Sequence, residues 1–103
     1  MSKPHITKAQ LIELLNLWGE GEISTPELQD WMLTNYDPPD VDIGLNEPEW
    51  IQDAMNIVMN EYEVVKLDKI VVENYTLALK FIGCSESSYT ETKHDFIRNG
   101  FMD

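Results

Sequence analysis

Clustered carboxylates are the side chains of this sequence whose type and spacing could perform chemistry, because paired carboxylates bind cations or transfer protons. The densest group is Asp37, Asp40, Asp42, Glu47 and Glu49. A calcium loop of the EF-hand type needs oxygen ligands at loop positions one, three and five and glycine at six. If Gly44 takes the glycine position, Pro39 falls where the first ligand belongs. The spacing therefore predicts no metal site.

Other catalytic patterns are missing from the sequence. His5 and His94 lie near opposite ends, and Cys84 has no histidine or cluster of cations beside it to activate its thiol. The sequence contains no paired-cysteine motif, no Gly-rich phosphate loop and no serine-nucleophile elbow. We therefore expect a protein that is not an enzyme and that uses no cofactor.

The distribution of charge is the most informative feature. The 103 residues include 7 Lys and Arg and 19 Asp and Glu, which gives a formal net charge of −12. Residues 9–65 contain no Lys or Arg, yet they contain these acids: Glu13, Glu20, Glu22, Glu27, Asp30, Asp37, Asp40, Asp42, Glu47, Glu49, Asp53, Glu61 and Glu63. So few scattered cations exclude direct binding to nucleic-acid backbones and to anionic membranes. The segregated acids predict a docking surface for a basic protein, although acidity also serves solubility alone.

The compartment is predicted from the same residues. No apolar run is longer than three residues, as in Trp31-Met32-Leu33, so we expect no membrane-spanning helix and no signal peptide. Cys84 is the single cysteine, which predicts no intrachain disulfide and favours a reducing cytoplasm.

Short helices must position these acids. Apolar residues recur with helical spacing after Thr7, and Ser24, Asn46 and Ser88 each precede a glutamate by three residues, as in a capping box. We expect helices that start at Thr7 and end at Gly19 as a left-handed terminus, from Ser24 to Tyr36, from Asn46 through Tyr62, from about 72 to 82, and from 88 to 98. Their stripes place Trp18, Trp31, Trp50, Phe96 and Ile97 in the core.

These elements predict an all-α fold, with five or six short helices in a compact bundle or a short helical solenoid. Residues 1–103 form a single domain, and residues 1–6 are expected to be a frayed tail. Residues 64–72 are ambiguous, but a strand there would have no second strand to pair with, so a turn and a new helix are preferred.

The connection at 37–46 is the predicted centre of the docking surface, since Pro38 and Pro39 stiffen it. Its apolar residues, Val41, Ile43 and Leu45, either enter the core or form one helical turn. Trp50 stands at its far end, where an aromatic ring can anchor an interface. The predicted partner-binding residues are Tyr36, Asp37, Asp40, Asp42, Glu47, Glu49, Trp50 and Asp53.

One stretch resembles a known family. Leu14-Leu15-Asn16-Leu17-Trp18-Gly19-Glu20-Gly21-Glu22-Ile23-Ser24, followed by Leu28-Gln29-Asp30-Trp31, is similar to the opening of small helical bacterial immunity proteins, including those of contact-dependent growth inhibition systems. The resemblance implies a role and no site residues: the chain would bind one basic cognate toxin, often a nuclease or ribonuclease, and occlude its active site.

Two other functions are compatible with the sequence. An acidic DNA mimic would block a nucleic-acid-binding protein, but it needs carboxylates spaced like duplex phosphates along a long face. A helical adaptor domain would be acidic only incidentally.

Overall fold

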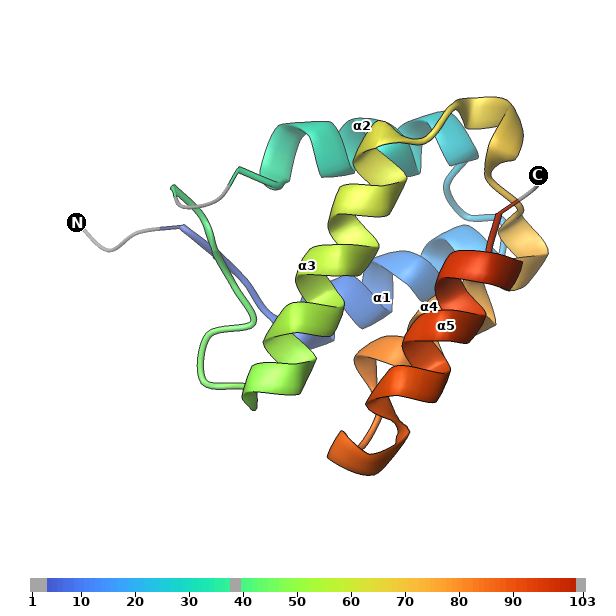
Figure 1. Cartoon of the computed structure of the whole chain (residues 1–103). Coiled ribbons are helices and arrows are strands. Elements are labelled where there is room, and N and C mark those ends of the chain that lie inside the picture. The colour runs from blue at the N-terminus through green and yellow to red at the C-terminus, as the bar shows by residue number, and fades with distance from the viewer. Residues whose placement is uncertain (1–3, 38–39, 102–103) are drawn as a thin grey trace.

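Five α-helices make up most of the chain in the computed structural model, which describes residues 4–37 and 40–101 (Figure 1). They are α1 (Lys8–Gly19), α2 (Thr25–Asn35), α3 (Glu49–Val64), α4 (Tyr75–Ile82) and α5 (Tyr89–Asn99). Short 3-10 turns at Leu67–Lys69, Val72–Asn74 and Glu86–Ser88 lie between the later helices. The fold is all-α, as predicted, and none of these described helices is long and apolar enough to cross a membrane.

Capping boxes begin the first two helices; the box at Ser24 was predicted, whereas at Thr7 the sequence predicted the helix start without the return bond to Gln10. The Thr7 hydroxyl accepts from the Gln10 N–H at 3.0 Å, and the Gln10 side chain accepts from the Thr7 N–H at 2.7 Å. Ser24 and Glu27 exchange the same pair of bonds at 3.2 and 2.9 Å. Each box satisfies two N–H groups that a helix start leaves without an intrahelical acceptor.

The capping boxes predicted for α3 and α5 are wrong. Asn46 has φ 73°, in the left-handed region, whereas a capping residue needs extended backbone. Pro48 instead precedes α3, and no side chain caps that helix. Ahead of α5, Ser88 makes no bond toward Glu91, because it already forms a box with Ser85 in the preceding turn.

Gly19 does not take the left-handed conformation expected of it. Gly19 is the last helical residue of α1, and the left-handed position falls on Gly21, with φ 81°. Gly19 is needed for space, because a Cβ there would overlap the ring of Tyr75.

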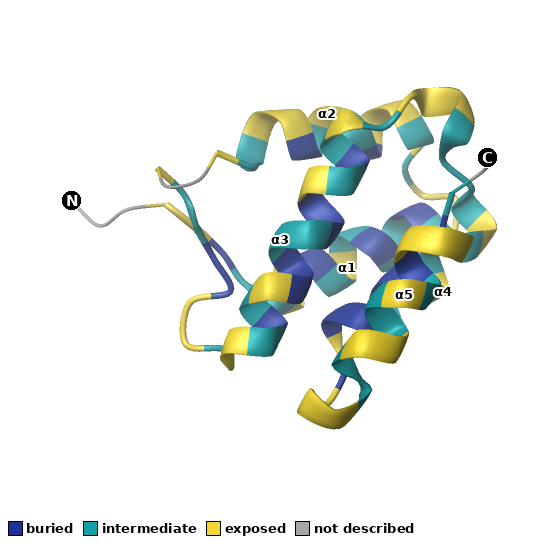
Figure 2. Cartoon of the chain, viewed as in Figure 1, coloured by how far each residue is buried: buried dark blue, intermediate teal, exposed yellow. Residues whose placement is uncertain are grey.

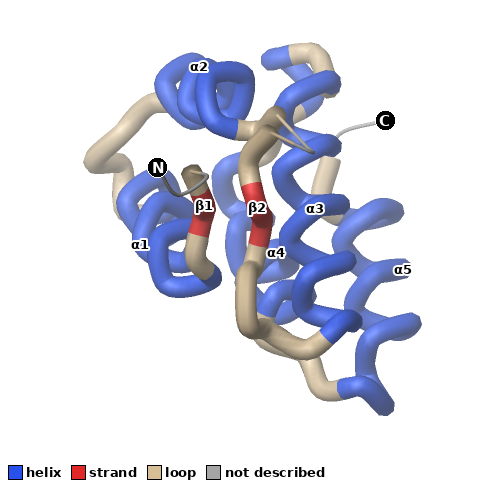
Figure 3. Tube along the Cα trace, turned by 90° about the vertical axis from the view of Figure 1, so that its left-hand side faces the viewer, coloured by secondary structure: helices blue, strands red, loops and turns tan. Residues whose placement is uncertain are grey.

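The N-terminal segment is ordered in part, which corrects the prediction of a frayed tail at 1–6; residues 1–3 lie outside the described chain. β1 (His5–Ile6) pairs in parallel with β2 (Asp42–Ile43), and Figure 3 shows the two strands side by side among the helices. The Asp42 N–H donates to the Pro4 carbonyl at 3.0 Å, and the Gly44 N–H donates to the Ile6 carbonyl at 2.9 Å. Burial of Ile6 and Ile43 supplies the apolar contribution to this pairing.

The connection before α3 is therefore extended rather than helical at Asp42–Ile43. Of its apolar residues, Ile43 is buried and Val41 packs against the core, but Leu45 is 54 % exposed. Pro38 and Pro39, which were expected to stiffen it, lie outside the described residues.

Residues 64–72 resolve into a turn, as preferred, but with one strand-like contact that the sequence prediction excluded. Val64 ends α3, a 3-10 turn follows, and Ile70 forms an isolated antiparallel bridge with Phe101. The partner was missed because it is a single residue after α5, and no strand-like run marks it.

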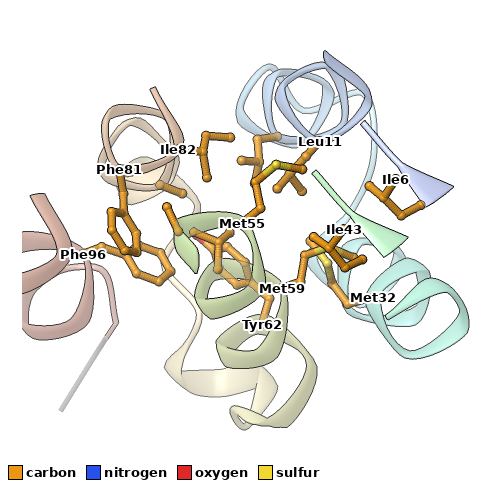
Figure 4. Packing of buried hydrophobic residues seen from close by; sticks show 14 of the residues in the cluster. Ile6, Leu11, Met32, Ile43, Met55, Met59, Tyr62, Phe81, Ile82 and Phe96 are labelled. Carbon is orange, nitrogen blue, oxygen red and sulfur yellow. The ribbon is translucent and has the colours of Figure 1, made fainter. Parts of the chain in front are cut away.

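One apolar cluster joins all five helices and both strands (Figures 2 and 4). In Figure 4, Met55, Met59 and Tyr62 of α3 occupy its centre, with Phe81 and Phe96 on one side and Met32, Ile43 and Ile6 on the other. This single core identifies the fold as a bundle.

Two predictions of burial need correction. Trp18 is buried, but Trp31 and Trp50 are only half-buried at the edge of the core. Ile97 is 43 % exposed, because Phe96 faces inward and the adjacent residue turns away by about 100° on a helix.

The aromatic centre contains a polar atom. Trp18 and Phe96 each meet the Tyr62 ring edge to face, with ring centroids 5.4 and 5.7 Å away. The Tyr62 hydroxyl is buried and has no hydrogen-bond partner within the described chain.

Candidate partner-binding surface

The acids of residues 9–65 all reach the surface. Nine of the thirteen are exposed, four are half-buried and none is buried. Asp42 apart, no carboxylate in the described ranges lies within ion-pairing distance of a described Lys, Arg or His. Apart from Asp42, and from Glu27, which accepts from the Ser24 N–H, the charges of these acids are available to a partner and are screened by salt.

The predicted docking residues follow the connection between α2 and α3 and the first turns of α3. A helix of 16 residues is about 24 Å long, since each residue adds about 1.5 Å. The connection leaves α2 beside the C-terminal end of α3 and returns to its N-terminal end (Figures 1 and 3). The acids of the connection and of the start of α3 therefore form a strip rather than one compact patch.

Tyr36, Asp37 and Asp40 form the upper end of this strip. Tyr36 ends α2 and is half-buried; burial raises the pKa of its phenol, and the carboxylate of Glu63 raises it further. Asp37 and Asp40 are exposed, and the Asp37 carbonyl accepts from the Val41 N–H at 2.9 Å. Both residues are therefore accessible to a partner.

Asp42, Glu47 and Glu49 continue the strip toward the start of α3. Asp42 is half-buried in β2, where it pairs in register with His5. The Glu47 carbonyl accepts from the Gln52 side chain at 2.9 Å, which anchors the end of the connection to α3. Glu49 is exposed in the first turn of α3, where the helix dipole favours a negative charge.

Trp50 and Asp53 face a different neighbour. The Trp50 indole N–H donates to the Cys84 carbonyl at 3.2 Å, between α4 and α5. Burial raises the pKa of the Tyr89 phenol, and the nearby carboxylate of Asp53 adds to that rise. Along α3, Trp50 lies about 20 Å from Glu63, the residue whose carboxylate acts on Tyr36. The structure therefore does not bring Trp50 and Asp53 together with Tyr36.

A groove between α1 and α2 was missed by the sequence prediction. It measures about 210 Å³ and is lined by Gln10, Glu13, Leu14, Leu17 and Trp31. The four α1 residues have the spacing of one helix face, beside the core stripe of Leu11 and Leu15. That spacing was visible in the sequence, but it did not reveal that Trp31 would lie across from it.

A second hollow, of about 290 Å³, lies on α5 and has the opposite charge. Its lining residues are Thr90, Lys93, His94, Ile97 and Arg98. Two of the seven Lys and Arg residues thus lie on α5, outside the cation-free stretch at 9–65.

The comparisons with known proteins do not identify a relative. No family model matches the chain, and neither the curated proteins nor the solved structures contain a match. Within residues 4–37 and 40–101, no three His, Cys, Asp or Glu side chains are grouped so that they could hold a metal ion.

Proposed function

We propose that this chain is an immunity protein that binds a basic cognate toxin, most simply a nuclease domain, and covers its active site. The observation that carries the proposal is the cation-free stretch at 9–65, whose acids reach the surface without an ion pair in the described chain, Asp42 apart. A toxin that cleaves nucleic acid must hold phosphates and is therefore basic. The single cysteine agrees with action in the cytoplasm.

The acidic connection is tied to the bundle at its middle and at its C-terminal end. β1 holds Asp42–Ile43, and the Gln52 side chain holds Glu47. A surface that is already ordered loses little conformational entropy on binding. Inhibition would then be steric and electrostatic, with carboxylates of the strip placed where the substrate's phosphates would lie.

Reversal of Asp37 and Asp40 to lysine tests this proposal. Both side chains are exposed, so the fold should tolerate the change. The probe is the basic C-terminal domain encoded by the reading frame upstream of this gene. We expect association about tenfold slower at low salt, with a weaker dependence on salt, because steering depends on opposite potentials.

The matched control is Asp68→Lys with Glu73→Lys, two exposed acids outside the strip that undergo the same change in charge. The control should associate as the wild type does. Equal slowing of both variants would assign the effect to net charge and remove the strip as the docking surface. An upstream frame that encodes no basic domain, or a domain whose activity this chain leaves intact, would refute the immunity function itself.

A further inference from the structure

The groove between α1 and α2 combines three features that a lone acidic cluster lacks. Leu14, Leu17 and the aromatic Trp31 are among its lining residues, and Leu14 and Trp31 also pack against the core. Leu17 is half-buried but is not among the residues that pack against the core. An apolar side chain in that position is available to a ligand.

Two polar groups of the groove are open, on Trp31 and Glu13, whereas the Gln10 side chain already accepts from the Thr7 N–H at 2.7 Å. The indole N–H groups of Trp18 and Trp50 are bonded inside the protein, to the Thr25 hydroxyl at 3.0 Å and to the Cys84 carbonyl. The Trp31 indole has no such partner within residues 4–37 and 40–101, and neither has the Glu13 carboxylate. The groove therefore offers one donor and one charged acceptor beside an aromatic face.

The charge around the groove favours a cation. Glu20 continues the stripe of Glu13 by two turns, and Glu27 lies one turn before Trp31 on α2. Lys8, the cation of α1, lies about 140° around the helix from Glu13. No described positive group of α1 or α2 therefore opposes a cation there.

We propose that this groove binds an arginine side chain of the basic partner, with the guanidinium stacked on Trp31 and paired with Glu13. A planar guanidinium stacks on tryptophan and donates two parallel bonds to a carboxylate, which a lysine cannot do. The aliphatic stem of the arginine would lie along Leu14 and Leu17. Only the identity of the partner rests on the proposed function; the arginine site stands on the groove itself.

The experiment is an NMR titration of the full chain with acetyl-Gly-Arg-Gly-amide at low salt. The three indole N–H signals are followed, and the matched probe is the same peptide with citrulline, which keeps the shape of arginine but removes its charge. We expect the Trp31 signal alone to move with the arginine peptide. The response to citrulline should be at least about threefold weaker, the size of an exposed cation–π contact.

Two conservative variants keep the test independent of folding. Glu13→Gln should weaken the response of Trp31 about threefold, and Trp31→Phe should retain a stacking face while it removes the reporter signal. In Trp31→Phe the backbone amide of Glu13 is followed instead, and it should still respond to arginine. Equal movement of all three indole signals, equal binding of citrulline, or no effect of Glu13→Gln would overturn the proposal.

The same spectra separate this proposal from the immunity function. If the amides of Asp37 and Asp40 respond and Trp31 does not, the groove is refuted while the acidic strip keeps its support. If Trp31 responds but the chain leaves the toxin domain active, the arginine site stands and the immunity function falls.

Discussion

Replacement of Tyr62 by phenylalanine should stabilise the protein. The Tyr62 hydroxyl is buried without a hydrogen-bond partner in the described chain, while its ring is held edge to face by Trp18 and Phe96. A buried hydroxyl with no partner costs about 1–3 kcal/mol in protein mutational data. Phenylalanine keeps the ring contacts and removes that cost, and the small gap that it leaves returns part of the gain.

We expect Tyr62→Phe to raise the free energy of unfolding by about 1 kcal/mol, or the melting temperature by about 4–8 °C for a domain of this size. Urea denaturation followed by tryptophan fluorescence measures it. Tyr89→Phe, at a half-buried ring on α5, is the control and should change stability by less than about 0.5 kcal/mol. A lower urea midpoint for Tyr62→Phe would refute the reasoning, because it would show that the hydroxyl is hydrogen-bonded in solution.

Alkaline pH tests the same burial independently. Burial raises the pKa of the Tyr62 phenol far above its ordinary value. Below about pH 10 both the folded and the unfolded states keep this proton, so the contribution is complete. Above that pH the unfolded state loses the proton first, and stability should fall by about 1.4 kcal/mol per pH unit. Tyr62→Phe should abolish this part of the slope, and a slope that persists unchanged would contradict it.

Three further substitutions test the backbone and the caps. Gly44→Ala should lower the free energy of unfolding, measured by urea denaturation, by about 1 kcal/mol more than Gly21→Ala. Both glycines have positive φ, but only at Gly44 would the added Cβ meet another side chain, the Met55 sulfur at 2.9 Å. Equal costs would contradict this. Gln29→Ala should lower the free energy of unfolding by about 1–3 kcal/mol, because the Gln29 amide donates at 3.1 and 2.6 Å to two carbonyls at the end of α3. An unchanged urea midpoint would show that those bonds do not stabilise the fold. Hydrogen bonds from the backbone and side chain of Ser24 lower the pKa of Glu27. Glu27→Gln should therefore be less stable than the wild type at pH 7, and this difference should disappear as the pH falls through the lowered pKa. A difference in melting temperature that is the same at pH 7 and at pH 2 would refute this.

Local chemistry explains which parts of the fold were predictable. Thr7 and Ser24 bond to groups three residues away, so the helix starts that they cap could be predicted from the sequence. The same spacing at Asn46 failed, because Asn46 has a left-handed backbone in a connection whose path includes pairing with the distant β1. Ser88 failed for a local reason, since Ser85, three residues before it, already takes its side chain as the partner of another box.

The candidate surface divides in the same way. The exposure of the acids followed from their charge, and the structure confirms that none is buried. Their arrangement did not follow, since Trp50 turns toward Cys84 and Asp53 toward Tyr89. The groove beside Trp31 needed the crossing of α1 and α2, which no periodicity encodes.

Because β1 pairs with β2, the conformation of the acidic connection depends on the first residues of the described chain. Closing the loop from Ile6 to Asp42 costs about 3 kcal/mol of chain entropy, and two backbone bonds and two isoleucines offset it. Such a small element opens more readily than the helices. A ligand that binds the connection in its paired form should slow hydrogen exchange at the amides of Asp42 and Gly44. Removal of the residues before Ile6 should weaken that ligand, because the paired form is then less populated.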